Sequence, residues 1–364
     1  MKKVILLVLS WRLLLFLPLF FLPFIPSPTN TRYLGISPWA NFDGIPYLSI
    51  ASQGYVNEAR FFPLYPLIIK VIVFIARLPI TPYIYFVTGF LLSNIAFLIT
   101  VLVLYKLLRL DYSHKISLLS ILFLLLFPAS FFFGSVYSES IFLLLTVLSF
   151  YFARKRKWLL AIAIAMFLPV TRSVGIVILP ALFVEWLLQQ KEKNVPSFSI
   201  LLLLFIIPIG LIEYAIYNFL KWGNALYFIQ AQTELGNSRS TGIVLIPQTL
   251  FRYAKILLTV PITQYVWHIA LLELAVFIFG AILLYFAYAK KIRLSYFVFS
   301  LLAFLIPTST GTFTGLPRYV IVLFPLFAAL ALVKNKTVKI IYCVISIILS
   351  IALLMLFARG YYIS

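Results

Sequence analysis

Residues 340–357 read IIYCVISIILSIALLMLF, an apolar run of 18 residues without a charged side chain. A helix needs about 20 such residues to cross the hydrocarbon core of a bilayer. The whole chain has the same character, since 64% of its 364 residues are hydrophobic, 10% are charged and the mean hydropathy is +1.11. A soluble domain carries about one quarter charged residues, so lipid must be the solvent for most of this chain.

The apolar runs also decide between the two structures that can cross a bilayer. Backbone amides in lipid must be paired within the spanning structure, which leaves helices and closed barrels. Barrel strands alternate apolar and polar residues, whereas these runs are unbroken. We therefore predict an all-α, polytopic membrane bundle of about eleven transmembrane helices, forming one domain over residues 1–364. The predicted spans are residues 4–25, 83–108, 116–133, 138–153, 158–170, 173–188, 198–217, 264–289, 294–307, 318–333 and 338–357.

The basic residues predict how these spans are oriented. The chain has 29 Lys and Arg against 9 Asp and Glu, which is typical of cytoplasmic loops in membrane proteins, so we expect no nucleic acid partner. Two further apolar stretches, 61–75 and 243–261, are predicted to lie in the membrane surface as helices. If these two stretches do not cross the membrane, all basic turns fall on the cytoplasmic side. These turns are residues 109–115, 154–157, 191–193, 290–293 and 334–339.

The same assignment of spans places the N-terminus in the cytoplasm and the C-terminus outside. The first apolar stretch lacks a small-residue cleavage site, so we expect a retained helix rather than a signal peptide. Outer loop 26–82 and outer segment 218–263 then form one extracytoplasmic face, which carries Glu58, Glu234 and Arg239. The lone Cys343 lies within a span, which excludes a disulfide framework.

Asp43 is the first candidate for chemistry on the outer face. It stands in the stretch WANFDGIPY, residues 39–47, which also contains Tyr47. An Asp before a Gly among aromatic residues is compatible with an Asx-capped turn. It is equally compatible with a carboxylate at the membrane boundary that takes a proton or orients a hydroxyl group.

Glu139 and two arginines are the other candidates. Glu139, two residues after Tyr137, is either a first-turn acid favoured by the helix dipole or a partner of the Asp43 site. Arg172 and Arg318 each stand at an outer helix start, where the dipole disfavours a cation. They either extend to the interface or bind the phosphate of an anionic lipid headgroup.

Six short motifs occur in an order that resembles the PIG-V-like mannosyltransferases. This family is related to GPI mannosyltransferase II and belongs to the GT-C class of membrane glycosyltransferases. The motifs are Phe42-Asp43, IASQGY at 50–55, FFPLYPL at 61–67, YSES at 137–140, Thr171-Arg172 and Arg318-Tyr319, with the stretch 223–232 also in the expected position. The similarity extends from Trp39 to about Leu330. The chain departs from the family at Phe42, where Trp is usual, and at Ile45-Pro46, where polar residues are frequent.

The resemblance implies a GT-C-like fold and transfer of a sugar, mannose in this family, with inversion at the anomeric carbon. The donor would be a polyprenyl phosphate such as dolichyl phosphate mannose, and the acceptor a glycan or lipid on the extracytoplasmic face. Asp43 matches the family's catalytic acid and would act as base or acceptor orienter, with Glu139 as its catalytic partner. The residues expected to bind substrate are Arg172, Arg318, Tyr319, Tyr137, Tyr47 and Gln232. No cofactor is required, although Asp43 and Glu139 could bind a divalent metal.

Two other classes of function are compatible with such a chain. A transporter or flippase of lipid-linked sugars would carry ionisable residues inside the membrane and show repeated halves. The candidates are Glu213 and Glu273, and no repeat is evident. A non-catalytic membrane subunit would tolerate Asp43→Asn. A multi-pass protein of this kind is expected in the plasma membrane of a prokaryote or the endoplasmic reticulum of a eukaryote.

Overall fold

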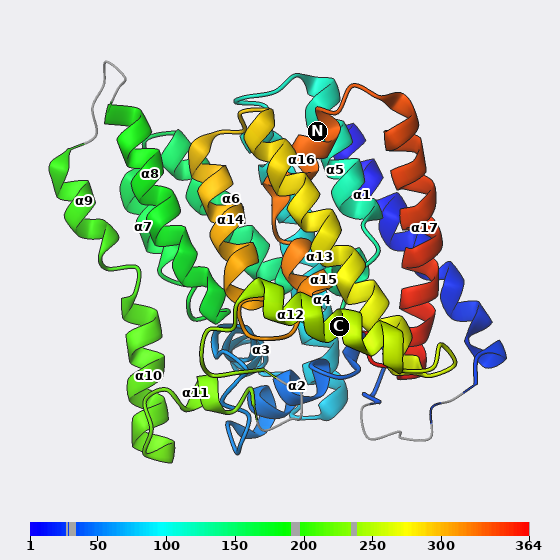
Figure 1. The fold of residues 1–364 in the computed structure, drawn as a ribbon. Coiled ribbons are helices and arrows are strands. Elements are labelled where there is room, and N and C mark those ends of the chain that lie inside the picture. Colours follow the sequence, from blue (N-terminus) through cyan, green and yellow to red (C-terminus); the bar gives the residue numbers. More distant parts are fainter. Residues whose placement is uncertain (27, 29–33, 191–196, 234–238, 364) are drawn as a thin grey trace.

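The computed structural model describes residues 1–26, 28, 34–190, 197–233 and 239–363. Every regular element in these ranges is a helix, and the helices form one bundle (Figure 1), which confirms the predicted all-α class. The α-helices are α1 Lys2–Leu14, α2 Gly44–Gln53, α3 Leu64–Ile75, α4 Pro82–Leu108, α5 His114–Leu126, α6 Glu139–Arg154, α7 Trp158–Ala165, α8 Ile178–Gln190, α9 Phe198–Leu204, α10 Ile209–Trp222, α11 Tyr227–Gln230, α12 Ile246–Thr259, α13 Tyr265–Ala289, α14 Leu294–Thr308, α15 Leu316–Val320, α16 Phe324–Ala331 and α17 Lys336–Arg359. The 3-10 helices are η1 Leu17–Phe24, η2 Pro38–Ala40, η3 Ser130–Gly134 and η4 Ser173–Val177.

Six helical stretches among the described residues are long and apolar enough to cross a membrane. They are Lys2–Phe24, Pro82–Leu108, Ser173–Gln190, Phe198–Trp222, Tyr265–Ala289 and Lys336–Arg359. Each overlaps one of the eleven predicted spans. The remaining five predicted spans are also largely helical, but in shorter pieces, so the count of eleven stays a prediction.

Two of these five stretches are divided or shortened for reasons that the sequence and the packing explain. The predicted span 116–133 is α-helical only to Leu126, because the residue before Pro128 is disfavoured in the α conformation. The predicted span 318–333 is divided between α15 and α16. Every residue of α16 is buried, and this helix packs against α5 and α13 in the interior of the bundle. The apolar side chains of α16 therefore pack against neighbouring helices, so their hydrophobicity does not by itself indicate contact with lipid.

The two stretches predicted to be surface helices are helical and short. α3 has 12 residues and buries Tyr65, Ile69 and Val73, while Phe74 is exposed. α12 has 14 residues and buries Thr249 and Tyr253. Both are too short to cross a bilayer. Figure 1 shows them with α2 and α11 at the end of the bundle where the C-terminus lies. Their position in a membrane surface stays a prediction.

The opposite end of the bundle collects the basic turns around Glu185 of α8. The buried carboxylate of Glu185 accepts hydrogen bonds of 2.7 Å from Nε and Nη2 of Arg293, which precedes α14. Arg154, at the end of α6, lies 3.6 Å from Glu185 and donates two hydrogen bonds to Asp111, of 2.6 and 2.8 Å. These contacts unite three of the predicted cytoplasmic turns at one end of the bundle. Residues 191–193 lie outside the described residues.

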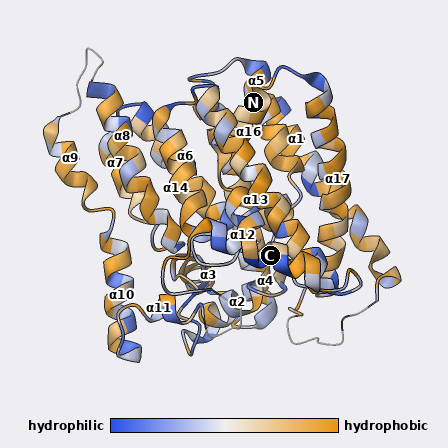
Figure 2. Cartoon of the chain, in the orientation of Figure 1, coloured by the Kyte–Doolittle hydropathy of each residue, from blue (hydrophilic) through white to orange (hydrophobic). Residues whose placement is uncertain are grey.

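Figure 2 shows the resulting distribution of polarity, with hydrophobic residues along the helices and hydrophilic ones at the two ends of the bundle. The N-terminus lies at the end with the basic turns (Figure 1). Each end is therefore closed by polar and charged groups, with apolar helices between them. The side of the membrane that each end faces stays a prediction.

Glu185→Gln is expected to destabilise the fold. Removal of this charge leaves two arginines partly buried without their shared carboxylate, and breaking such an arrangement costs about 3–5 kcal/mol. We expect a clearly lower unfolding midpoint for the purified protein in detergent, measured by thermal denaturation. Glu213→Gln, at an exposed position of α10, is the control and should leave the midpoint nearly unchanged. Equal midpoints for both variants would contradict a stabilising role of this network.

Candidate active site

The loop before α2 holds Asp43 at the site end of the bundle. Asn41 fixes this loop to the end of α17, because its Nδ2 donates to the carbonyl oxygens of Phe357 and Ala358. Phe42 adopts a positive φ of 54°, which is unfavourable for an aromatic residue. Its ring packs against Phe357, with 5.8 Å between the ring centroids. The hydrogen bonds of Asn41 and the ring contact of Phe42 therefore hold the loop in place, and the next residue, Asp43, lines a cavity.

Asp43 does not cap the helix that follows it. It occupies the N-cap position of α2 without a side-chain capping bond. Its Oδ2 instead accepts a hydrogen bond of 2.5 Å from Nη1 of Arg318, and 29% of the Asp43 side chain stays exposed. The Asx-turn interpretation is therefore wrong, and the carboxylate is available at a surface.

Glu139 joins both arginines behind the cavity. This first residue of α6 is fully buried, and its Oε1 accepts bonds of 2.6 Å from Arg172 Nη1 and Arg318 Nε. Its Oε2 has no hydrogen-bond partner. The first-turn position suits an acid. Two charge-assisted bonds give it a second role, which is to connect Arg172, before η4, to Arg318 on α15.

Aromatic side chains hold these charges in place. The Arg318 guanidinium lies 4.7 Å from the centroid of the Tyr137 ring, and Arg172 lies 4.6 Å from that of Tyr319. The Tyr137 hydroxyl donates to the carbonyl of Asn41 at 2.9 Å and accepts from the Asp43 amide at 3.2 Å. Cation–π contacts and hydrogen bonds thus fix both arginines and the carboxylate against rigid rings.

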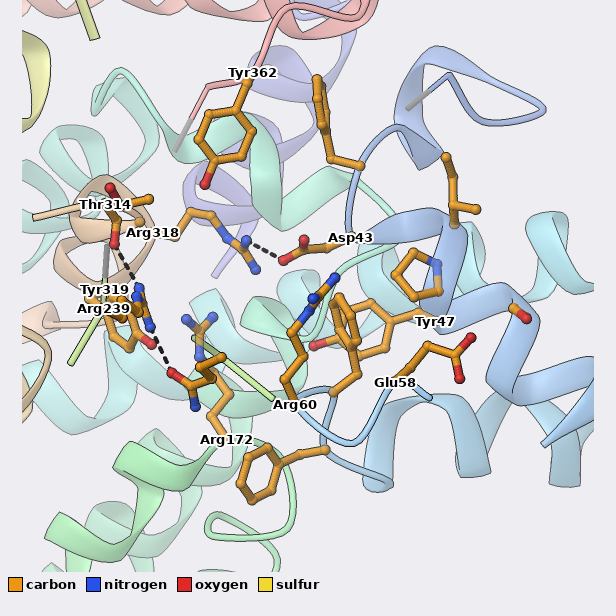
Figure 3. A pocket seen from close by; sticks show the side chains of 18 of the residues that line it. Asp43, Tyr47, Glu58, Arg60, Arg172, Arg239, Thr314, Arg318, Tyr319 and Tyr362 are labelled. Carbon is orange, nitrogen blue, oxygen red and sulfur yellow. Dashed lines mark hydrogen bonds and ion pairs between the residues drawn. The ribbon is translucent and has the colours of Figure 1, made fainter. Parts of the chain in front are cut away.

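A cavity of about 720 Å³ opens over this network. Six of the eight predicted site residues line it, namely Asp43, Tyr47, Arg172, Gln232, Arg318 and Tyr319. The other two, Glu139 and Tyr137, lie buried directly behind it. Figure 3 shows Tyr47 and Glu58 on one side of the cavity, Arg239, Thr314 and Tyr319 on the other, and Asp43 and Arg318 between them.

Segments far apart in the sequence complete the cavity wall. Tyr47 donates to Ser138 Oγ at 3.0 Å, which connects α2 to the start of α6. Gln232 accepts from Arg239 Nη1 at 3.0 Å, and Nη2 of the same arginine donates to the carbonyl of Thr314 at 2.7 Å. Gly315 has a φ of 81°, which an L side chain rarely adopts and which turns the chain into α15.

The sequence interpretation missed several lining residues. Arg60, Thr314 and Tyr362 were given no role, and Arg239 was noticed only as part of the outer segment. Tyr362 comes from the C-terminal tail, and its backbone carbonyl accepts a 2.7 Å bond from Tyr265. An Arg directly before the FFPLYPL motif was the one available signal for Arg60. Glu234 lies outside the described residues.

A family model matches most of the first half of the chain. Residues 15–190 match the model of a family described as Mannosyltransferase (PIG-V). The match confirms the resemblance to PIG-V mannosyltransferases. It contains the Phe42-Asp43, YSES and Thr171-Arg172 motifs, whereas Gln232, Arg239 and Arg318 lie outside it. Among curated proteins, none matches this chain.

Solved structures with a similar arrangement include an archaeal oligosaccharyltransferase. The Archaeoglobus fulgidus enzyme in its apo form is 12% identical, with 97% of this chain and 56% of that chain covered and a TM-score of 0.48. The same enzyme in complex with an inhibitory peptide and a dolichol-phosphate is 14% identical, with 98% and 56% covered and a TM-score of 0.45. The PIG-V-like chain thus spans about half the length of these structures.

A divalent metal does not fit the carboxylates of this PIG-V-like site as they stand. Asp43 and Glu139 are the two predicted ligands, and the Arg318 guanidinium occupies one oxygen of each. A metal ion prefers more oxygen ligands than these two acids supply. Among the described residues, no group of three or more His, Cys, Asp or Glu is placed to hold one. Arg318 supplies the positive charge between the two acids.

The arginines also set the ionisation of Tyr319. Burial raises the pKa of this phenol, but the guanidinium groups of Arg239 and Arg172 outweigh that effect and lower the pKa to about 8. The phenol is neutral below this pH and anionic above it. A low tyrosine pKa reports a positive potential at this side of the cavity.

Ultraviolet titration of the purified protein should therefore detect one tyrosine that ionises near pH 8. Tyr319→Phe is expected to remove this step, because the phenol is its source. Tyr285→Phe, an exposed tyrosine on α13, should retain the step. A step at pH 8 that persists in Tyr319→Phe would contradict the positive potential assigned to Arg239 and Arg172.

Proposed function

We propose that this protein is an integral membrane glycosyltransferase that transfers a sugar, mannose by its family, from a polyprenyl-phosphate donor to a hydroxyl group of a glycan or lipid acceptor. The observation that supports this most is that a partly exposed carboxylate and several guanidinium groups meet in one cavity. A base and a cationic region are what such a transfer requires, because a proton leaves the acceptor and a phosphate leaves the sugar.

Asp43 is the proposed base. Its carboxylate takes the proton of the acceptor hydroxyl while the oxygen attacks the anomeric carbon, and the bond between that carbon and the phosphate oxygen breaks. The electron pair of this bond leaves with the lipid phosphate, whose charge the cavity arginines stabilise. In-line attack inverts the anomeric centre. Arg318 fixes the direction of the carboxylate, because it holds one oxygen and leaves the side chain partly exposed.

Glu139 keeps the catalytic arrangement rigid rather than reacting itself. It is fully buried, so neither the acceptor nor the donor can reach it without displacing Arg172 or Arg318. Its charge holds both guanidinium groups at fixed positions. Fixed charges are effective in stabilising a leaving group, since they need no reorganisation during the reaction.

Transport receives less support than transfer from the two acids that suggested it. Glu273 on α13 accepts a hydrogen bond from the Tyr253 hydroxyl of α12, so this acid connects two helices. Glu213 is exposed on α10. Neither acid lines the cavity.

Asp43→Asn is expected to lower sugar transfer about 10²–10⁴-fold, the usual contribution of a general base. The assay measures transfer from a labelled polyprenyl-phosphate mannose in membranes that contain the protein and its native acceptors. Glu213→Gln is the matched control, because it removes a carboxylate outside the cavity. Wild-type rates in Asp43→Asn would remove Asp43 from the mechanism. Absence of transfer even in the wild type would favour the transporter or the non-catalytic subunit.

The proposal places the cavity on the extracytoplasmic side of the membrane and the basic turns on the cytoplasmic side. In a Cys343→Ser background, Val56→Cys marks the cavity end and Lys155→Cys marks the opposite end. An impermeant maleimide applied to the outside of intact cells or sealed vesicles of native orientation should label the first cysteine only. The second should react after permeabilisation. Labelling of both cysteines from one side would overturn the orientation.

A further inference from the structure

Arg318 and Arg172 form ion pairs with carboxylates. Arg318 donates through Nη1 to Asp43 and through Nε to Glu139, and Arg172 donates through Nη1 to Glu139. Two positive and two negative charges therefore balance within this group. A donor phosphate that displaced Arg318 would also release both acids of the site.

Arg239 differs from these two arginines in its partners. Its Nη1 and Nη2 donate to neutral oxygens, the side-chain amide of Gln232 and the backbone carbonyl of Thr314. Its Nε is buried and has no hydrogen-bond partner among the described residues. None of the ion pairs between described residues includes Arg239. In the part of the chain that the structure describes, the guanidinium thus has no carboxylate partner, and it brings a positive charge to the cavity wall.

The position of Arg239 is built into the fold through Thr314. Thr312 Oγ1 lies 2.9 Å from Thr314 Oγ1 and 3.1 Å from the hydroxyl of Tyr253, which donates to the buried Glu273. The Tyr253 oxygen also accepts a 2.8 Å bond from the amide of Phe313. The backbone that carries the Thr314 carbonyl is therefore fixed by α12 and α13, two helices outside the Asp43 network.

Tyr319 lies near two of the guanidinium groups. Arg172 is 4.6 Å and Arg239 is 6.0 Å from the centroid of its ring. Figure 3 shows Arg239, Arg172 and Tyr319 on one side of the cavity, apart from Asp43. These two arginines lower the pKa of Tyr319, because their positive charges lie close to its ring. An anion of the size of phosphate is the ligand that such charges favour.

We infer that Arg239, together with Arg172 near the Tyr319 ring, binds the phosphate group of the lipid-linked donor, and that Arg318 positions Asp43 and Glu139 instead of binding phosphate. This inference rests on the proposed function for the identity of the donor. It changes the expected role of Arg318 and adds a residue outside the segment that matches the family. It also separates the two tasks in space, since the leaving phosphate and the base occupy different sides of one cavity.

The test measures equilibrium binding of farnesyl phosphate to the purified full chain in detergent, without sugar transfer. Arg239→Gln is expected to weaken binding about 10- to 100-fold, because it removes charge-assisted hydrogen bonds. Lys255→Gln, which removes an exposed positive charge outside the cavity, is the matched control and should bind as the wild type does. Wild-type affinity in Arg239→Gln would overturn the inference.

Two further variants separate binding from positioning. Arg239→Lys keeps the charge and should retain affinity to within about tenfold, which shows that a loss in Arg239→Gln does not come from misfolding. Arg318→Lys should change farnesyl phosphate affinity less than about threefold while it lowers kcat for sugar transfer. A loss of phosphate affinity in Arg318→Lys as large as that in Arg239→Gln would contradict the positioning role.

Two other ligands identify the source of the phosphate. Farnesol lacks the anion, so its weaker binding should be the same in the wild type and Arg239→Gln. Inorganic phosphate lacks the tail and should bind at least about tenfold more weakly than farnesyl phosphate. Equal affinity for both phosphates would overturn the assignment to a lipid. Arg239-dependent binding in a protein that transfers no sugar would support the subsite and contradict the proposed function.

Discussion

The bridge that Arg318 makes between Asp43 and Glu139 is the interaction on which the rest of the site depends. It joins the loop before α2, the first turn of α6 and the short helix α15, which are separated by up to 275 residues in the sequence. Arg172 extends it to the start of η4. A fully buried Glu139 is tolerable only because both guanidinium groups compensate its charge. The same pairing gives Asp43 its direction, so the stability of this end of the bundle and the chemistry of the cavity have one origin.

The bundle repeats this solution at its other end. Glu185, buried like Glu139, is shared by arginines from two different elements. Charges inside an apolar bundle are costly unless they are paired, so both clusters lie where helices end and turns begin. The long apolar helices between them need only pack against one another and against lipid. Both ends have a cavity. The one at the Glu139 end, of about 720 Å³, is lined by four arginines, whereas the one at the Glu185 end, of about 560 Å³, has Arg293 and Lys291 beside Asp111 in its lining.

Several residues of the site were predictable because their types are rare in this chain. With nine acidic residues in 364, an Asp in an aromatic loop and a Glu at a helix start stood out, and both lie at the cavity. Arg172 and Arg318 were noticed because the dipole disfavours a cation at the helix starts predicted there, although Arg318 stands in the last turn of the five-residue helix α15. Arg239 was not predictable in this way, because its position depends on a carbonyl on a loop 75 residues away. The sequence also could not show that Arg318 pairs with two carboxylates, which argues against its role as a phosphate ligand.

Composition and the lengths of the apolar runs determined the class of this protein, because a helix that pairs its own backbone groups is what lipid permits. They did not determine whether each apolar run crosses the membrane or packs inside the protein. α16 reads as part of a span, yet it is a short interior helix, since hydropathy cannot distinguish lipid from a neighbouring helix as the apolar surrounding. The order of the motifs indicated the family resemblance and the candidate site residues, whereas the pairing of these residues depends on distances across the bundle. Only the tertiary structure decided that Arg318 belongs to the two acids and that Arg239 faces the cavity, because electrostatic interactions depend on separation in space and not in sequence.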